Sequence, residues 1–149
     1  MAKDGLQVST EKLDVKERDG FSARNGMTAV LNQADGSVFL FGGQDSEKDV
    51  QFEDVWRFKD NEVKQVELDP NAPCPAPRNS HSMTVVKGKA YIFGGANHDG
   101  PLADLWEFDM QNQSFKKVAL SGVPLPAIEM HTAHCYQDKL LILGGRALP

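Results

Sequence analysis

An apolar stretch that ends in a Gly-Gly pair occurs three times in the chain. The first glycines of the pairs are Gly42, Gly94 and Gly144, and they lie 52 residues (42 to 94) and then 50 residues (94 to 144) apart. A period near 50 residues predicts one supersecondary unit that is copied along the chain, and a four-stranded propeller blade has this size. The sequence therefore predicts a repeat protein whose function lies in the loops of its units.

Within the second unit, the hydrophobic pattern predicts short antiparallel strands. Strands over 82–86 and 90–93 flank Lys87-Gly88, which is a tight hairpin signal. The same place is taken in the other units by two further dipeptides, Asp35-Gly36 and Gln137-Asp138. A third strand follows, in which Trp106 and Phe108 share one face because side chains alternate. No segment shows a helical pattern, so the expected fold class is all-β.

These motifs together resemble the kelch repeat. The sequence Pro-x-Pro-Arg-x-x-His-Ser at 75–82 precedes the hairpin, and Asp-Leu-Trp-x-Phe follows the Gly-Gly pair at 104–108. The resemblance covers residues 24–145, with departures at Met27, Ile128, Val63 and Phe115. It implies β-propeller blades, in propellers of about six blades, that bind proteins through their loops. The positions that repeat, and that we expect to be structural, are Gly42, Gly43, Trp56, His81, Gly94, Gly95, Trp106, His131, Gly144 and Gly145.

The repeat divides the chain into one partial propeller. Residues 1–23 are expected to form an outer strand of a preceding blade, over 7–13, and a connector. The first repeat is 24–77, the second is 78–127, and 128–149 is a partial third. At 149 residues, three blades leave the propeller open. The chain is then part of a larger protein, a short gene product or half of an oligomer, and its open ends predict self-association or a covering partner.

Composition excludes several classes of function. A formal net charge of −5 argues against nucleic acid as a partner. No segment is long and apolar enough to span a membrane, and the N-terminus has no apolar signal region. The two cysteines, Cys74 and Cys135, are too far apart in sequence to indicate a disulfide framework. We therefore expect a cytoplasmic protein, and we expect Cys135 to be buried.

Candidates for catalysis or metal binding are weak. His131, His134 and Cys135 form the most metal-like cluster, but residues three apart on a strand face opposite ways. His131 also aligns with His81, which favours a structural histidine. Some propellers of the resembled family are copper oxidases, yet no ligand set of histidines and tyrosines can be placed here. The expectation is no enzyme activity, no cofactor and no metal.

Strand direction predicts which loops share a face. The loops after each Gly-Gly pair and the connectors between blades lie on one side, at 44–53, 70–80, 96–103 and 122–130. Loops on a rigid scaffold commonly carry binding sites. The expected function is a non-catalytic protein-interaction module that uses this side, with an unidentified protein partner; the alternatives are a self-associating half-propeller or scaffold subunit and, less favoured, a metal-dependent propeller enzyme. The candidate partner-binding residues are Arg24, Asn25, Gln44, Asp45, Glu47, Asp49, Phe52, Arg78, Asn97, His98, Asp99, Glu129 and Arg146.

Two groups of these candidates have a competing structural interpretation. Arg24 and Arg78 recur at one repeat position, so each either packs against the fold or offers a fork for a partner's carboxylates. Asp54 and Asp104 precede the third strand of their units, where a carboxylate is expected to accept hydrogen bonds from the backbone of the turn. The acidic loops could recognise a basic partner or could be solvated turns.

Overall fold

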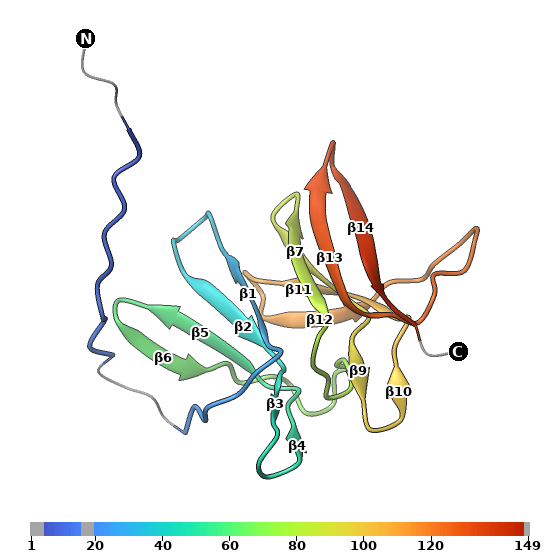
Figure 1. The fold of residues 1–149 in the computed structure, drawn as a ribbon, viewed down its shortest axis with the longest axis horizontal. Helices are drawn as coiled ribbons and strands as arrows, with labels where there is room; N and C mark the ends of the chain where they lie inside the picture. The colour runs from blue at the N-terminus through green and yellow to red at the C-terminus, as the bar shows by residue number, and fades with distance from the viewer. Residues whose placement is uncertain (1–4, 16–19, 148–149) are drawn as a thin grey trace.

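The computed structural model describes residues 5–15 and 20–147, and within these stretches every regular element is a β-strand. Two four-stranded sheets and a long hairpin follow one another along the chain (Figure 1). We call them blades 1, 2 and 3. Blade 1 contains β1 (Thr28–Leu31), β2 (Val38–Phe41), β5 (Val55–Lys59) and β6 (Glu62–Gln65). Blade 2 contains β7 (Ser82–Val86), β8 (Lys89–Phe93), β11 (Leu105–Asp109) and β12 (Ser114–Lys117). Blade 3 contains β13 (Glu129–Tyr136) and β14 (Lys139–Arg146).

Each blade is an antiparallel meander. The strand order is β1-β2-β5-β6 in blade 1 and β7-β8-β11-β12 in blade 2, so each strand pairs with its neighbours along the unit. The third unit supplies only the first two strands of this pattern. The prediction of an all-β, open set of four-stranded blades is confirmed.

Two of the three predicted tight turns have the expected backbone. The prediction for Asp35-Gly36 is wrong, because β1 and β2 are joined by a longer turn in which the Asn32 N–H donates to the Ser37 carbonyl and Gly36, but not Asp35, has positive φ. Lys87 and Gly88 have φ values of 49° and 76°, and Gln137 and Asp138 have 48° and 58°. Positive φ at both central residues is the type I′ geometry, whose twist matches that of the flanking strands. These turns fix the register of β7 with β8 and of β13 with β14.

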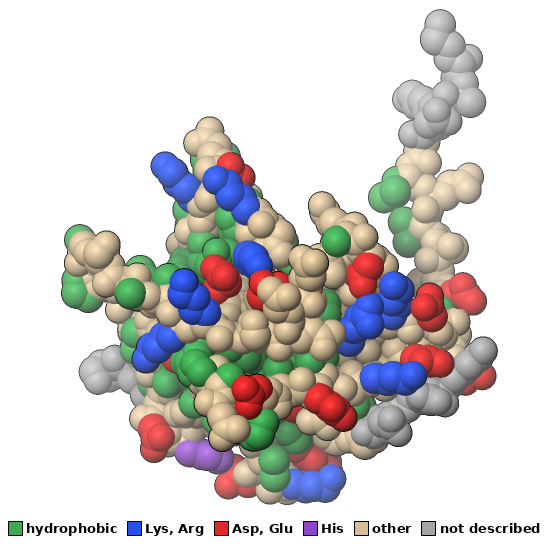
Figure 2. Space-filling view, turned by 180° about the vertical axis from the view of Figure 1, so that it is seen from behind, with side chains coloured by type: hydrophobic (Ala, Val, Ile, Leu, Met, Phe, Trp, Pro, Cys, Tyr) green, Lys and Arg blue, Asp and Glu red, His purple; other side chains and the backbone are tan. Residues whose placement is uncertain are grey.

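Two short ribbons were not predicted from the sequence. In blades 1 and 2, the chain that follows the Gly-Gly pair forms a small hairpin. In the first hairpin β3 (Gln44–Asp45) pairs with β4 (Val50–Gln51), and in the second β9 (Ala96–Asn97) pairs with β10 (Gly100–Pro101). Both ribbons project from the same edge of the molecule, at the bottom of Figure 1 and of the reverse view in Figure 2. Segments that we expected to be loops are therefore held in extended form.

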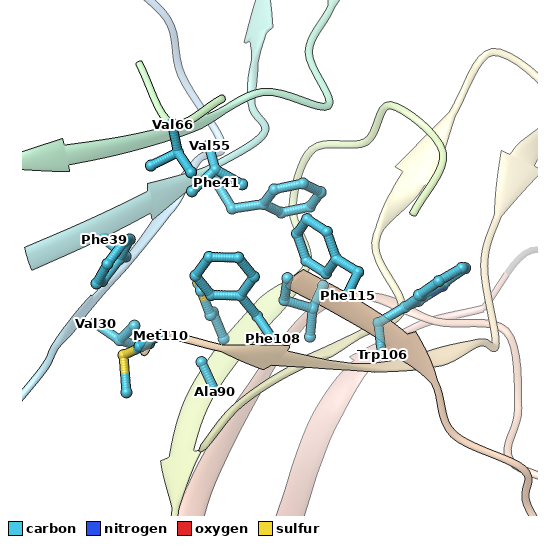
Figure 3. Close-up of a cluster of buried hydrophobic side chains, with 12 residues drawn as sticks. Val30, Phe39, Phe41, Val55, Val66, Ala90, Trp106, Phe108, Met110 and Phe115 are labelled. Atoms are coloured by element: carbon cyan, nitrogen blue, oxygen red, sulfur yellow. The ribbon is translucent and has the colours of Figure 1, made fainter. Parts of the chain in front are cut away.

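The main hydrophobic core fills the space between blades 1 and 2 (Figure 3). Phe39 lies 5.4 Å from Phe108 between ring centroids, and Phe41 lies 5.6 Å from Phe115. Trp106 and Phe108 are both buried, as the alternation along β11 predicted. The other buried members are Val30, Val55, Val66, Met83, Ala90, Ile92 and Met110. Stacking of one sheet on the next therefore provides the core.

The predicted outer strand over 7–13 is absent from this structure. Residues 5–15 are described without regular structure and are largely exposed. An outer strand pairs with the third strand of its own blade, as β6 pairs with β5 and β12 with β11. Among the described residues, β5 and β11 are already paired on both edges, so no third strand is free to hold residues 7–13.

Candidate functional site

The loops predicted to share a side are brought together, and we call this side the loop face: residues 44–53, 70–80, 96–103 and 122–130. The connector joins the first ribbon where Asn79 Nδ2 donates to Gln44 Oε1 over 3.0 Å. The two ribbons also touch, because the His98 backbone N–H donates to Gln51 Oε1 over 3.2 Å. Hydrogen bonds between loops of different blades make the loop face one continuous surface.

The exposed tips of the two ribbons carry the candidates that are free to meet a partner. Glu47, Asp49, His98 and Asp99 are exposed. Figure 2 shows acidic side chains, together with basic and apolar ones, along the lower edge where the ribbons lie. In contrast to those four, Asp45 accepts hydrogen bonds from the backbone N–H groups of residues 47 and 48, so it shapes the first turn.

The prediction that Arg78 binds a partner is wrong, because its side chain is fully buried. Its guanidinium nitrogens lie 2.7 and 2.9 Å from the two oxygens of Asp104 and donate to the Gly94 carbonyl over 3.1 Å. Trp106 Nε1 donates to the same carboxylate over 2.7 Å. Burial raises the pKa of Asp104, but the hydrogen bonds from Arg78 and Trp106 outweigh it and hold that pKa below its usual value. This Arg–Asp–Trp cluster locks blade 2 internally.

Blade 1 repeats the cluster. Arg24 lies 2.6 Å from Asp54, its side chain is 2% exposed, and Trp56 Nε1 donates to the same carboxylate over 2.6 Å. The Arg24 guanidinium lies over the Phe52 ring, with 3.8 Å between the guanidinium carbon and the ring centroid. Phe52 therefore already packs against Arg24 within the blade. The partner-binding prediction for Arg24 is therefore wrong for the same reason, whereas that for the half-buried Phe52 stays a prediction. The carboxylates of Asp54 and Asp104 both accept hydrogen bonds from an arginine and a tryptophan side chain.

Five further candidates also have internal contacts. Asn25 is exposed but donates to Ser46 Oγ over 3.0 Å, and Gln44 is half-buried in its bond with Asn79. Glu129 is buried and forms an ion pair with Arg146, whose side chain remains 61% exposed. Asn97 accepts a hydrogen bond from the Asp99 backbone. Arg146 is therefore the charged residue of this group whose side chain is most exposed.

His81 and His131 link consecutive blades. Nε2 of His81 shares a hydrogen bond of 2.7 Å with the Thr28 hydroxyl of blade 1, and Nε2 of His131 shares one of 2.8 Å with Ser82 of blade 2. Burial, with the nearby charge of Arg78, lowers the pKa of His81 to about 3. Burial also lowers the pKa of His131. Both histidines are thus neutral hydrogen-bonding partners between blades.

The metal interpretation of the third unit has no geometric support. His134 and Cys135 are exposed, whereas His131 is buried against blade 2, so the three side chains do not converge. Within residues 5–15 and 20–147, no group of three His, Cys, Asp or Glu residues is placed to hold a metal ion. The expected burial of Cys135 is wrong, because it lies near the tip of the hairpin β13–β14, which no further sheet covers in the described part of the chain.

A hollow lies beside the outer edge of blade 1. It has a volume of about 1220 Å³ and lies between the start of β5 and the connector to blade 2. Its walls include Phe52, Val66, Leu68 and the exposed Cys74. A smaller groove of about 470 Å³ occupies the same place in blade 2, lined by residues 103–105 and 117–120. The sequence does not predict either groove, because each forms only when two segments of one folded unit come together.

The stacked blades and their repeated Arg–Asp–Trp clusters define an open β-propeller made of homologous units. The profile of the KLHDC2/KLHL20/DRC7 Kelch-repeats domain matches residues 6–148. The chain therefore belongs to the kelch-repeat family. Kelch repeats generally mediate protein–protein interactions. In the part of the chain that the structure describes, no helix is suited to crossing a membrane.

Three curated relatives illustrate the breadth of the similarity. Tip elongation aberrant protein 3 of Schizosaccharomyces pombe is 48% identical over 48 residues, which is 32% of this chain and 4% of that protein. Human Host cell factor 2 is 31% identical over 126 residues, which is 72% of this chain and 16% of that protein. Human Multiple epidermal growth factor-like domains protein 8 is 29% identical over 142 residues, which is 91% of this chain and 5% of that protein. The chain thus spans 4% to 16% of the length of these relatives.

Proposed function

We propose that this chain is a non-catalytic binding module that recognises another protein through the loop face. The observation that carries the proposal is the pair of ribbons β3–β4 and β9–β10, which present exposed side chains from a rigid support. Loops fixed on a scaffold lose less conformational entropy on binding than free loops do. The membership of the kelch family agrees with this function.

The chemistry of the ribbon tips favours a partner with basic or hydrogen-bonding groups. Glu47, Asp49 and Asp99 supply exposed carboxylates, and the exposed His98 supplies an imidazole in the turn of the second ribbon. Lys48 lies close to Asp45 and offsets part of the negative charge. Such rim charges act mainly on the association rate and on specificity.

A second candidate function is self-association. Blade 3 ends in exposed apolar side chains, with Leu143 51% and Leu141 41% exposed. Contiguous apolar surface of this kind marks an interaction site. In this alternative, the chain is a structural subunit whose open end contacts another molecule.

The test of the loop face needs a purified partner. The chain is immobilised, proteins retained from an extract of its source are identified by mass spectrometry, and one purified partner is titrated by calorimetry. The loop-face variant carries Glu47→Ala, His98→Ala and Asp99→Ala. The matched control carries Gln33→Ala, Gln111→Ala and Lys139→Ala, all exposed at the hairpin ends of the blades.

We expect the loop-face variant to weaken binding by tenfold or more, about 1.4 kcal/mol, and the control to leave binding unchanged. Equal binding by the wild type and the loop-face variant would reject the loop face. A loss confined to the control would move the site to the opposite side of the blades.

A further inference from the structure

A polar hollow lies between blades 1 and 2 on the side opposite the loop face, where the first turns of the two blades lie (Figure 1). It has a volume of about 650 Å³, which is within the range of sites for small ligands. Its walls include the β1–β2 turn, the β7–β8 turn and the β11–β12 turn, and all three belong to the four-stranded blades. We call this hollow the turn-side cleft.

The lining of the turn-side cleft combines apolar and charged side chains. Met110 is 4% exposed and Val85 is half-buried, and they supply apolar surface. Five of the lining residues are charged: Arg57, Lys87, Lys89, Asp35 and Asp109. Three cations thus stand against two carboxylates, although the chain as a whole carries a formal net charge of −5. The cleft therefore favours an anion over a cation as its ligand.

Two of the cations are paired with the two carboxylates. Arg57 Nη2 donates to Asp35 Oδ2 over 2.6 Å, and Lys89 forms an ion pair with Asp109. Hydrogen bonds from Ser37 hold the pKa of Asp35 well below its usual value, and the hydrogen bond from Lys89 lowers the pKa of Asp109 to about 2. Both carboxyl groups are therefore ionised at neutral pH, and the count of charges holds there.

Lys87 is the most exposed cation of the cleft. Its ammonium nitrogen lies 3.4 Å from Asp138 Oδ2, and the two side chains are 70% and 64% exposed. Ion pairs this exposed contribute little to stability, because water screens them. The Lys87 side chain can therefore turn toward a ligand in the cleft at little cost.

Arg57 has a hydrogen-bond donor that the fold does not use. Its Nε is buried and has no acceptor among the residues that the structure describes. In the other three described arginines Nε donates to an oxygen, which belongs to Ser22 for Arg24 (3.3 Å), to Ala76 for Arg78 (3.0 Å) and to Glu129 for Arg146 (3.1 Å). A buried donor without an acceptor is costly and requires an explanation. An oxygen atom of a ligand would supply the missing acceptor.

The repeat does not account for the charges of the cleft. Positions that serve the packing of the blades carry the same residue in both units, as Trp56 and Trp106 do. The cleft residues Asp35, Arg57 and Asp109 instead have equivalents of opposite charge in the other unit, which are Lys87, Glu107 and Lys59. Glu107 has a different contact, since it accepts a hydrogen bond from the Tyr91 hydroxyl over 2.9 Å. The chemistry of the cleft is thus particular to this pair of blades.

We propose that the turn-side cleft binds a small organic carboxylate that has a short apolar stem. One carboxylate oxygen would accept from Arg57 Nε, which a small rotation of this 34% exposed side chain presents to the cleft. A guanidinium is a planar fork that matches a carboxylate. Blade 2 supplies Lys87 and Lys89 to the same anion, and the stem packs on Val85 and Met110. This site is separate from the loop face and does not depend on it.

The test titrates the nitrogen-15-labelled 149-residue chain with sodium butyrate and follows the Arg57 Nε–Hε signal by NMR. The backbone amide of Gly88, in the wall of the cleft, is the second reporter, and Arg78 Nε–Hε, bonded within its own blade, is the reference. Inorganic phosphate at equal ionic strength is the comparison anion, because it has charge without a stem. The variant is Arg57→Lys, and the matched control is Arg146→Lys, at an ion-paired arginine outside the cleft.

We expect butyrate to shift both reporters saturably, with a Kd of about 10 mM or tighter, and to leave the Arg78 signal in place. Arg57→Lys should weaken butyrate binding by about tenfold, because an ammonium lacks the fork, and Arg146→Lys should not change it. Asp35→Asn should strengthen binding, since it removes the carboxylate that competes for the guanidinium. Phosphate should bind about tenfold more weakly than butyrate.

Three results would each overturn the proposal. The first is the absence of a saturable shift at Arg57 and Gly88. The second is equal affinity for butyrate and phosphate, since the cleft would then attract any anion. The third is an equal loss of butyrate binding in Arg57→Lys and Arg146→Lys, which would place the binding outside the cleft.

Discussion

At the scale of single residues, blade 2 contains an ion pair between the fully buried Arg78 and the partly buried Asp104. Arg78 is fully buried, and three of its nitrogens donate to protein oxygens. Such a charge is tolerated only because Asp104 compensates it. The sequence left the role of this arginine open between fold and partner, and the geometry assigns it to the fold.

Removing the carboxylate should therefore be costly. We expect Asp104→Asn to lower the free energy of unfolding by about 3–5 kcal/mol, because Arg78 is left charged and unpaired. Asp99→Asn, in the exposed turn of the second ribbon, is the matched control and should change it by less than about 0.5 kcal/mol. Urea unfolding of both variants measures the difference, and equal small losses would show that the pair is not what stabilises blade 2.

His81 makes the stability depend on pH. Its pKa is lowered from 6.5 to about 3 in the folded chain, so the unfolded chain binds the proton more tightly. Stability is complete above pH 6.5 and is lost progressively as the pH falls from there toward 3. At pH 5.5 the loss from this residue should be about 1.4 kcal/mol.

The measurement is the free energy of unfolding by urea between pH 7.5 and 5.5. His81→Gln should reduce the slope of stability against pH. A slope that is equal in the wild type and in His81→Gln would exclude His81 as the source. His131, whose pKa is also lowered, accounts for part of the remaining slope.

At the scale of elements, the Gly-Gly ends of β2 and β8 are junctions between blades, whereas the end of β14 is not. All three first glycines have positive φ, at 68°, 60° and 70°. An alanine there carries about 1–2 kcal/mol of backbone strain in every case. Only at Gly42 and Gly94 does the added Cβ also meet a carbonyl of the next blade.

This difference gives an internal comparison. We expect Gly94→Ala to destabilise the chain by about 1–3 kcal/mol more than Gly144→Ala, because its Cβ would lie 2.5 Å from the Ile128 carbonyl. Chemical denaturation of the two variants tests this directly. If Gly144→Ala were as destabilising as Gly94→Ala, then some contact around Gly144 must exist that the described chain does not show.

At the scale of the whole molecule, stability comes from stacking sheets, and the end of the stack leaves apolar surface uncovered. Leu141 and Leu143 on β14 are exposed, as is Val123 at 89% in the connector before it. Figure 2 shows apolar side chains on the loop that projects on the left, which is the orange loop on the right of Figure 1. The edge of β14 away from β13 is unpaired among the described residues.

We expect this surface to cause weak association that rises with concentration. Light scattering after size exclusion should give a mass above 16.4 kDa that increases with loading. The double variant Leu141→Lys with Leu143→Lys should return the mass toward that of one chain, since it places charges on the apolar patch. A monomer at all concentrations would mean that the exposed leucines do not drive association.

The fold was largely predictable because its signals are local and repeated. A period near 50 residues, two-residue hairpins and the alternation around Trp106 each involve residues close in sequence, so the all-β blades follow from the printed chain. The candidate site was predictable only in part. The exposed tips at Glu47, His98 and Asp99 were identified, but Arg24 and Arg78 were wrongly included, and the ribbons that hold the tips were missed.

What the sequence determined by itself is thus the unit and its repetition, since backbone propensity and side-chain alternation act over a few residues. Only the tertiary structure decided which side chains form contacts within and between the stacked blades and which remain exposed. Arg78 meets Asp104 across 26 residues of chain, and His81 meets Thr28 across 53. These pairs form because blades fold and stack, and that same stacking leaves Thr132 and Gly144 without the neighbours that their repeat equivalents have.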